Sequence, residues 1–175
     1  MNDELPKRRS IRLRHYNYSQ LGAYFVTICA HERRCLFGCV LDGQALLNPI
    51  GDVIAREWFK SSEMRPDVEL DAFVVMPNHL HGIVLLGRSE AATAARPLGA
   101  VIRGFKAATT RAASSAGHGP GHPLWQRNYY EHIIRSEESL EAIRAYIADN
   151  PARWAQDRQN PSATQLTKPD AAWQV

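Results

Sequence analysis

Two histidines separated by a single leucine, His79 and His81, are the side chains of this sequence best suited to chemistry. They follow the turn-forming pair Pro77-Asn78 and open the apolar run 80–86, which is typical of a strand. Alternate residues of a strand point to one face, so the two imidazoles are presented together. Neutral imidazoles can hold a divalent metal ion from one side and leave its other side open. An ordinary surface or core pair is the competing interpretation, and the position beside a turn, where a cleft can begin, argues against it.

A second pair of polar side chains, Tyr146 and Asn150, lies near the end of the sequence. Four residues apart on a helix, they share one face. The apolar residues Leu140, Ile143 and Ile147 place the buried stripe of that helix beside this face. We therefore expect Tyr146 and Asn150 to face the sheet. Taken alone, they could equally be a packing tyrosine and a helix cap, because asparagine is common at helix ends.

The rest of the sequence predicts the elements that would position these side chains. Apolar and β-branched runs predict strands at 22–30, 68–76 and 80–86, and a hairpin at 35–47 around Asp42-Gly43. Helical spacing and capping residues predict helices that begin at Asn48-Pro49, cover 96–116, and run from Ser136 to about residue 150. The aromatic segment 125–134 leaves its type open.

This order of strands and helices predicts an α+β fold, with one antiparallel sheet and helices packed on one face. The length of 175 residues fits one domain. We divide the chain into a basic N-terminal arm at 1–15, a folded domain at 16–155 and a flexible C-terminal tail at 156–175.

Composition narrows the functional classes. The chain is 45% hydrophobic and 22% charged, as expected of a globular protein. It has neither an apolar run long enough to cross a membrane nor the apolar stretch of a signal peptide. Three cysteines in one region do not form a disulfide framework. We therefore expect a cytoplasmic protein without a membrane partner.

Basic residues are concentrated in two segments, although the net charge is only +3. The charged residues that we interpret as nucleic-acid contacts are Arg8, Arg9, Arg12 and Arg14 in the arm, and Arg103, Lys106 and Arg127 further along. Such asymmetry favours a polyanionic partner, whereas a merely solvated basic face is the alternative.

Three motifs resemble one protein family. The run FVVMPNHLHGIVLL at 73–86 resembles the HUH motif (His, hydrophobic, His) of single-tyrosine transposases. The runs WQRNYYEHIIR at 125–135 and YIADNP at 146–151, with the strand GAYFVTIC at 22–29, resemble the branch of REP-associated tyrosine transposases. The resemblance covers residues 10–155, in order.

The resemblance implies a ferredoxin-like (RRM-like) sheet with the HUH pair on a central strand, which makes 16–155 an HUH transposase domain. It implies that Tyr146 is the nucleophile and that His79, His81 and Asn150 are ligands of Mg²⁺ or Mn²⁺. Insertion-sequence relatives often carry glutamine where this sequence has Asn150. Tyr129 and Tyr130 are interpreted as packing or base-stacking residues.

The function that the resemblance implies is that of an endonuclease and strand transferase for single-stranded DNA. It would act on REP-type hairpins, through a 5′-phosphotyrosine intermediate, in the bacterial nucleoid, as a monomer or a homodimer. Two alternatives remain open. One is a DNA hairpin-binding protein without catalysis, and the other is a metal-dependent phosphodiesterase that uses activated water and tolerates Tyr146→Phe.

Overall fold

A four-stranded antiparallel sheet forms the centre of the molecule, with strand order β4-β5-β1-β6. The computed structural model describes residues 22–87, 97–119 and 121–163. The sheet strands are β1 (Gly22–Cys29), β4 (Val68–Met76), β5 (His79–Leu86) and β6 (Tyr130–Ile134), and a separate hairpin joins β2 (Gly38–Leu41) to β3 (Gln44–Leu47). The helices are α1 (Pro49–Glu63), α2 (Leu98–Ser115) and α3 (Glu137–Asp149), with short 3-10 turns η1 (His31–Arg33) and η2 (Trp154–Gln156).

The connection β1-α1-β4-β5-α2-β6 is the ferredoxin-like arrangement. The predicted α+β fold is therefore confirmed, and β5 lies inside the sheet between β4 and β1, as the resemblance implied. The segment whose type the sequence left open supplies the edge strand β6, which pairs with β1. Trp125, at the start of that segment, forms an isolated bridge to Ala30.

Helices α1 and α3 begin where their capping residues predict. The side chain of Asn48 accepts hydrogen bonds from the backbone N–H groups of Ile50 and Gly51, which fixes the first turn of α1. The side chain of Ser136 accepts from the N–H of Ser139 and caps α3 in the same way. These local signals explain why both helices start as the sequence indicates.

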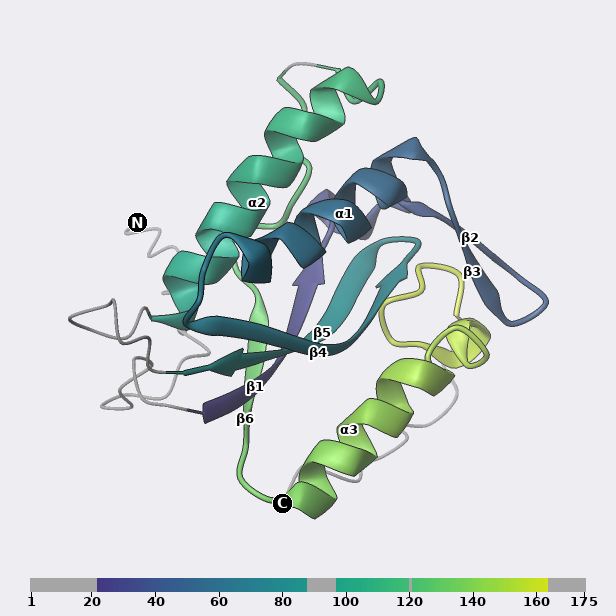
Figure 1. The fold of residues 1–175 in the computed structure, drawn as a ribbon. Coiled ribbons are helices and arrows are strands. Elements are labelled where there is room, and N and C mark those ends of the chain that lie inside the picture. The colour runs from purple at the N-terminus through teal and green to yellow at the C-terminus, as the bar shows by residue number, and fades with distance from the viewer. Residues whose placement is uncertain (1–21, 88–96, 120, 164–175) are drawn as a thin grey trace, which may run out of the picture.

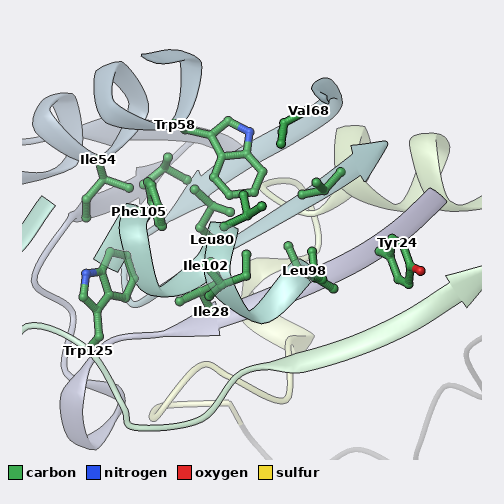
Figure 2. Close-up of a cluster of buried hydrophobic side chains, with 14 of the residues drawn as sticks. Tyr24, Ile28, Ile54, Trp58, Val68, Leu80, Leu98, Ile102, Phe105 and Trp125 are labelled. Carbon is green, nitrogen blue, oxygen red and sulfur yellow. The ribbon is translucent and has the colours of Figure 1, made fainter. Parts of the chain in front are cut away.

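One face of the sheet is covered by α1 and α2 and forms the main hydrophobic core (Figure 1). Figure 2 shows Trp58 of α1 and Phe105 of α2 packed against the strands. Their rings meet edge to face with centroids 5.1 Å apart, and the ring of Phe105 lies 5.6 Å from that of Trp125. Strand β5 contributes Leu80 and Val84 to this core. Gly82 lies between them, and a Cβ there would stand 2.5 Å from Trp58, so only glycine lets the tryptophan approach the strand.

The opposite face of the sheet is covered by α3, which corrects the prediction that the helices pack on one face (Figure 1). A smaller apolar cluster joins Phe25 and Ile83 of the sheet to Ile143 and Ile147 of α3. The helical spacing correctly predicted the apolar stripe of α3. It could not indicate which side of the sheet the stripe covers, because either face offers apolar side chains.

The described part of the chain contains no helix long and apolar enough to cross a membrane. The cysteines are free thiols. Residues 1–15, predicted as a basic arm, and 164–175 of the predicted tail lie outside the described residues. Residues 156–163, which the sequence assigned to the flexible tail, have a defined structure and return toward the β4–β5 turn (Figure 1).

Candidate active site

The two histidines lie on the α3 face of the sheet because of strand alternation. On β5, Leu80 and Val84 face the main core, so His79, His81 and Ile83 face α3. Both imidazoles are buried, and their ring centroids are 4.4 Å apart. The fold therefore presents the pair as the sequence predicted, beneath the helix that carries Tyr146.

The orientation of His79 is set by Asn78. The amide nitrogen of Asn78 donates to the backbone carbonyls of Arg33 and Gln159, so its Oδ1 must be an acceptor. That Oδ1 lies 2.8 Å from Nδ1 of His79, which must then carry the proton and donate it. The remaining ring nitrogen, Nε2, is left as a bare lone pair without a hydrogen-bond partner among the described residues. A histidine held by a second polar group in this way is prepared to bind a metal.

His81 is held by β1. Its Nδ1 lies 2.8 Å from the hydroxyl of Thr27, its direct neighbour across the strand pair, and its ring stacks on Phe25. Burial lowers the pKa of His81 well below its usual value, and the neighbouring His79 lowers it further. Burial likewise lowers the pKa of His79 to about 4, against opposing effects of Asp157 and Asn150. Both imidazoles are thus neutral at pH 7, the state in which they can bind a metal.

Tyr146 of α3 reaches over the histidine pair. Its hydroxyl lies 3.4 Å from Nε2 of His81, and the two rings meet edge to face at 5.3 Å. Burial and the nearby carboxylate of Asp157 raise the pKa of Tyr146 to about 12, and the effects that lower it, from Asn150, Arg158 and Arg153, are smaller. The phenol is therefore protonated in this environment and needs activation before it can act as a nucleophile.

Asn150 follows α3 immediately and is 2% exposed. It lies close enough to His79 to favour the protonated form of that ring, although its Oδ1 makes no hydrogen bond to the described residues. A buried amide oxygen without a partner costs free energy unless a ligand satisfies it. The sequence left open whether Asn150 is a helix cap or a residue of the site. It is the C-cap of α3, and its side-chain oxygen is also directed at the site.

Asp157 is a site residue that sequence reasoning missed, because residues 156–175 were assigned to a flexible tail. Its carboxylate is buried, and one oxygen lies 3.8 Å from Nε2 of His79. His79, His81 and Asp157 offer ligand atoms that lie within 4.8 Å of one another. No sequence signal pointed to this residue, since an aspartate in a polar run is usually solvated.

The donor set is suited to a divalent cation. Nε2 of His79, Oδ1 of Asn150 and Oδ2 of Asp157 are buried, electron-rich and without hydrogen-bond partners among the described residues. Three such atoms around one point repel each other unless a cation lies between them. Mixed nitrogen and oxygen donors fit Mg²⁺ or Mn²⁺, and the arrangement can hold such an ion.

The predicted nucleic-acid contacts have separate locations. Arg103 and Arg127 are exposed, whereas the ammonium of Lys106 donates to the backbone carbonyls of Gln126 and Asn128. Lys106 therefore holds the segment before β6 as well as carrying charge. A shallow groove beside it is lined by Lys106, Arg111 and Arg127. Arg8, Arg9, Arg12 and Arg14 lie outside the described residues.

Known proteins resemble this chain in sequence and in fold. No family model matches the chain. An uncharacterised protein of Haemophilus influenzae is 40% identical over 173 residues, which cover 90% of this chain and 95% of that protein. A solved REP-associated tyrosine transposase bound to a REP hairpin aligns with a TM-score of 0.59 and 24% identity, over 82% of this chain and 74% of that one.

A second solved structure, provisionally assigned as a transposase of Deinococcus radiodurans, aligns with a TM-score of 0.47 and 20% identity, over 79% of this chain and 95% of that one. That likeness is too weak to carry an argument. The chain belongs to the same family as the Haemophilus influenzae protein, and its fold is the fold of the REP-associated tyrosine transposase.

Proposed function

We propose that this protein is a metal-dependent enzyme that cuts and rejoins single-stranded DNA through Tyr146, and thus a REP-associated tyrosine transposase. The observation that carries the proposal is the convergence of a tyrosine hydroxyl with two buried neutral imidazoles, 3.4 Å from the nearer one. Nucleophile and metal ligands come from distant parts of the sequence, and such a convergence is typical of an active site. The fold shared with a hairpin-bound transposase supports the same conclusion.

In this proposal His79, His81 and Asn150 hold Mg²⁺ or Mn²⁺. When bound, the ion would offset the negative charge that develops on the scissile phosphate. The chain itself keeps the imidazoles neutral by burial and keeps their lone pairs turned toward the site through Asn78 and Thr27. Helix α3 keeps the phenol of Tyr146 at the edge of this donor set.

The covalent step conserves the number of phosphodiester bonds. The phenolic oxygen of Tyr146 forms a bond to phosphorus and its proton leaves to solvent, while the bond from phosphorus to the 3′ oxygen breaks. The departing oxygen takes up a proton, giving a 3′-hydroxyl and a 5′-phosphotyrosine. A 3′-hydroxyl then attacks the phosphotyrosine and releases the phenol, which reseals or transfers the strand without a nucleotide cofactor.

The proposed substrate is a REP-type hairpin with an adjoining single strand, since the solved neighbour is bound to a REP hairpin. Arg103, Lys106 and Arg127, with the arm arginines, would contact its phosphates. Tyr146 meets the histidine pair of its own chain, which favours a monomer acting in cis over a helix-exchanging dimer. The proposed location is the cytoplasm, at the nucleoid.

The test is covalent attachment of labelled DNA. Purified protein is incubated with Mn²⁺ and the hairpins that flank its gene, and the products are separated under denaturing conditions. We expect a protein–DNA adduct that Tyr146→Phe abolishes. Tyr130→Phe is the matched control, because this exposed tyrosine lies on the same face of the sheet and meets the ring of Phe25 edge to face.

The outcomes separate the competing functions. If Tyr146→Phe still cleaves the DNA and no adduct forms, the phosphodiesterase is favoured, in which activated water attacks the phosphate. Binding without cleavage would favour the non-catalytic hairpin-binding protein. An adduct that survives Tyr146→Phe and disappears in Tyr130→Phe would move the nucleophile to the edge strand.

A further inference from the structure

The segment after α3 brings an acidic side chain into the donor set. The carboxylate of Asp157 is 5% exposed. Its Oδ1 accepts a hydrogen bond of 2.7 Å from the backbone N–H of Gln159, which fixes the orientation of the group. Its Oδ2 is buried, has no hydrogen-bond partner among the described residues and lies 3.8 Å from Nε2 of His79. One oxygen is thus occupied by the chain and the other is directed at the site.

We propose that Asp157 is a fourth ligand of the metal ion, and that the segment 151–159 is folded to deliver its carboxylate to the histidine pair. This inference rests on the metal site of the proposed function. It adds a ligand from a segment that lies outside both the HUH motif and the helix that carries Tyr146.

The contact between His79 and Asp157 carries the argument. Because Nδ1 of His79 donates to Asn78, the atom that faces the carboxylate is a lone pair. The separation of 3.8 Å is too long for a hydrogen bond, and neither atom has another hydrogen-bond partner among the described residues. Two electron-rich atoms therefore face each other in a buried place, an arrangement that a shared cation stabilises.

The distance agrees with a shared ion. Metal–ligand bonds of about 2.1 Å place two ligands of one ion at most about 4.2 Å apart. The two atoms at 3.8 Å lie inside that limit. The charge also agrees, because His79, His81 and Asn150 are neutral and would leave a divalent ion uncompensated. One carboxylate offsets half of that charge and adds the hard oxygen donor that Mg²⁺ and Mn²⁺ prefer.

The segment is tied to the residue that orients His79. The side chain of Asn78 donates to the backbone carbonyl of Gln159 at 2.6 Å, and its Oδ1 accepts from His79. The thiol of Cys29 donates to the side-chain oxygen of Gln159 at 3.6 Å. Asn78 therefore couples the position of Asp157 to the orientation of the imidazole, and the two donors are held as one unit.

The experiment is a calorimetric titration of the full-length protein with Mn²⁺, without DNA. We expect Asp157→Asn to weaken Mn²⁺ binding at least about tenfold, as expected when a ligand or its support is lost. Asp149→Asn is the matched control, because it removes an equal charge from a nearby exposed residue that pairs with Arg153. It should bind Mn²⁺ as the parent protein does. Equal affinity of Asp157→Asn and the parent would overturn the proposal.

Melting of the metal-free protein gives a second measurement. If Asp157 is a ligand, Asp157→Asn removes an uncompensated buried charge, so its melting temperature stays the same or rises, while the increase caused by Mn²⁺ shrinks. If Asp157 instead forms a structural ion pair with a protonated His79, the metal-free variant melts at a lower temperature and keeps the Mn²⁺ response. That second result would reject the ligand role.

Tyr146→Phe separates this inference from the proposed function. It should still bind Mn²⁺, because the phenol is not one of the proposed ligands, whatever its effect on DNA attachment. Adducts that survive in Tyr146→Phe would reject the proposed nucleophile and leave the ligand role of Asp157 supported. Parent protein that does not bind Mn²⁺ would reject the ligand role.

Discussion

The two faces of the central sheet are built on opposite principles. On the α1 and α2 face, large apolar side chains fill the space. The buried indole of Trp125 donates to the hydroxyl of Thr109, while the indole nitrogen of Trp58 has no hydrogen-bond partner among the described residues. On the α3 face, a small apolar cluster lies beside lone-pair atoms of His79, Asn150 and Asp157 that have no such partner. The α1 and α2 face contributes to the stability of the fold. The α3 face holds polar groups whose interactions are completed only when a ligand is bound.

One strand serves both faces. Leu80 and Val84 of β5 are part of the main core, and His79 and His81 alternate with them on the other side. The core thus holds the histidines in register through the strand that they share. The difference between the faces can be tested by changing one face at a time, because the main core should control folding and the α3 face should control ligand binding.

The largest effect on stability is expected from Trp58→Ala. Trp58 is fully buried among Phe73, Phe105 and the strand at Gly82, so truncation leaves a large cavity. The expected loss is about 3–5 kcal/mol, measured by urea denaturation. The neighbouring Phe59→Ala is the control, because that ring is exposed and should cost about 1 kcal/mol or less. Similar losses in both variants would contradict the assignment of the main core.

A fall in pH should destabilise the metal-free protein through the α3 face. Burial lowers the pKa of His79 to about 4 in the folded state, against its ordinary value of 6.5. Below pH 6.5 His79 is protonated in the unfolded chain but stays neutral in the folded chain. The contribution of His79 to the free energy of unfolding is therefore fully present above pH 6.5 and is lost as the pH falls toward 4. The full loss from this residue is about 3 kcal/mol.

Denaturation curves at pH 7 and pH 5 measure this effect. His79→Gln removes the titrating group and should flatten the profile relative to the parent. His81 acts in the same direction, since burial also lowers its pKa, so part of the dependence remains in the variant. An identical profile for parent and variant would show that His79 is not held neutral by burial.

A pair of matched substitutions compares buried polar groups on the two faces. Thr109 donates to the carbonyl of Phe105 and accepts from Trp125, so Thr109→Val should cost about 1–3 kcal/mol. Asn150→Ala removes an amide oxygen without a partner, so the loss should stay within about 1 kcal/mol in the absence of metal. Asn150→Ala should nevertheless weaken Mn²⁺ binding. A larger loss for Asn150→Ala than for Thr109→Val would mean that the α3 face is built for stability as well.

The smallest effect concerns the exposed arginines. Arg127→Gln should weaken binding to hairpin DNA several-fold and lower the slope of log affinity against log salt by about 1, since one phosphate contact is lost. Arg56→Gln, which changes an exposed arginine in the middle of α1, provides a comparison with the same loss of charge. Equal slopes for Arg127→Gln and the parent would remove Arg127 from the proposed DNA contacts.

Much of the fold followed from local signals. Asn48 and Ser136 cap their helices, and the alternation of β5 presents His79 and His81 together, because these effects act within a few residues. The edge strand β6 was not identified, since five residues of mixed polarity carry too little periodicity. Its pairing with β1 decides its conformation.

The sequence by itself determined which residues could do chemistry, because strand and helix periodicity place His79 beside His81 and Tyr146 beside Asn150. Only the tertiary structure decided that these pairs meet, because the packing of α3 on the face opposite α1 and α2 is a long-range choice. It also brought Asp157 into the site. No local pattern distinguishes a solvated aspartate from one that the fold buries against a histidine 78 positions earlier.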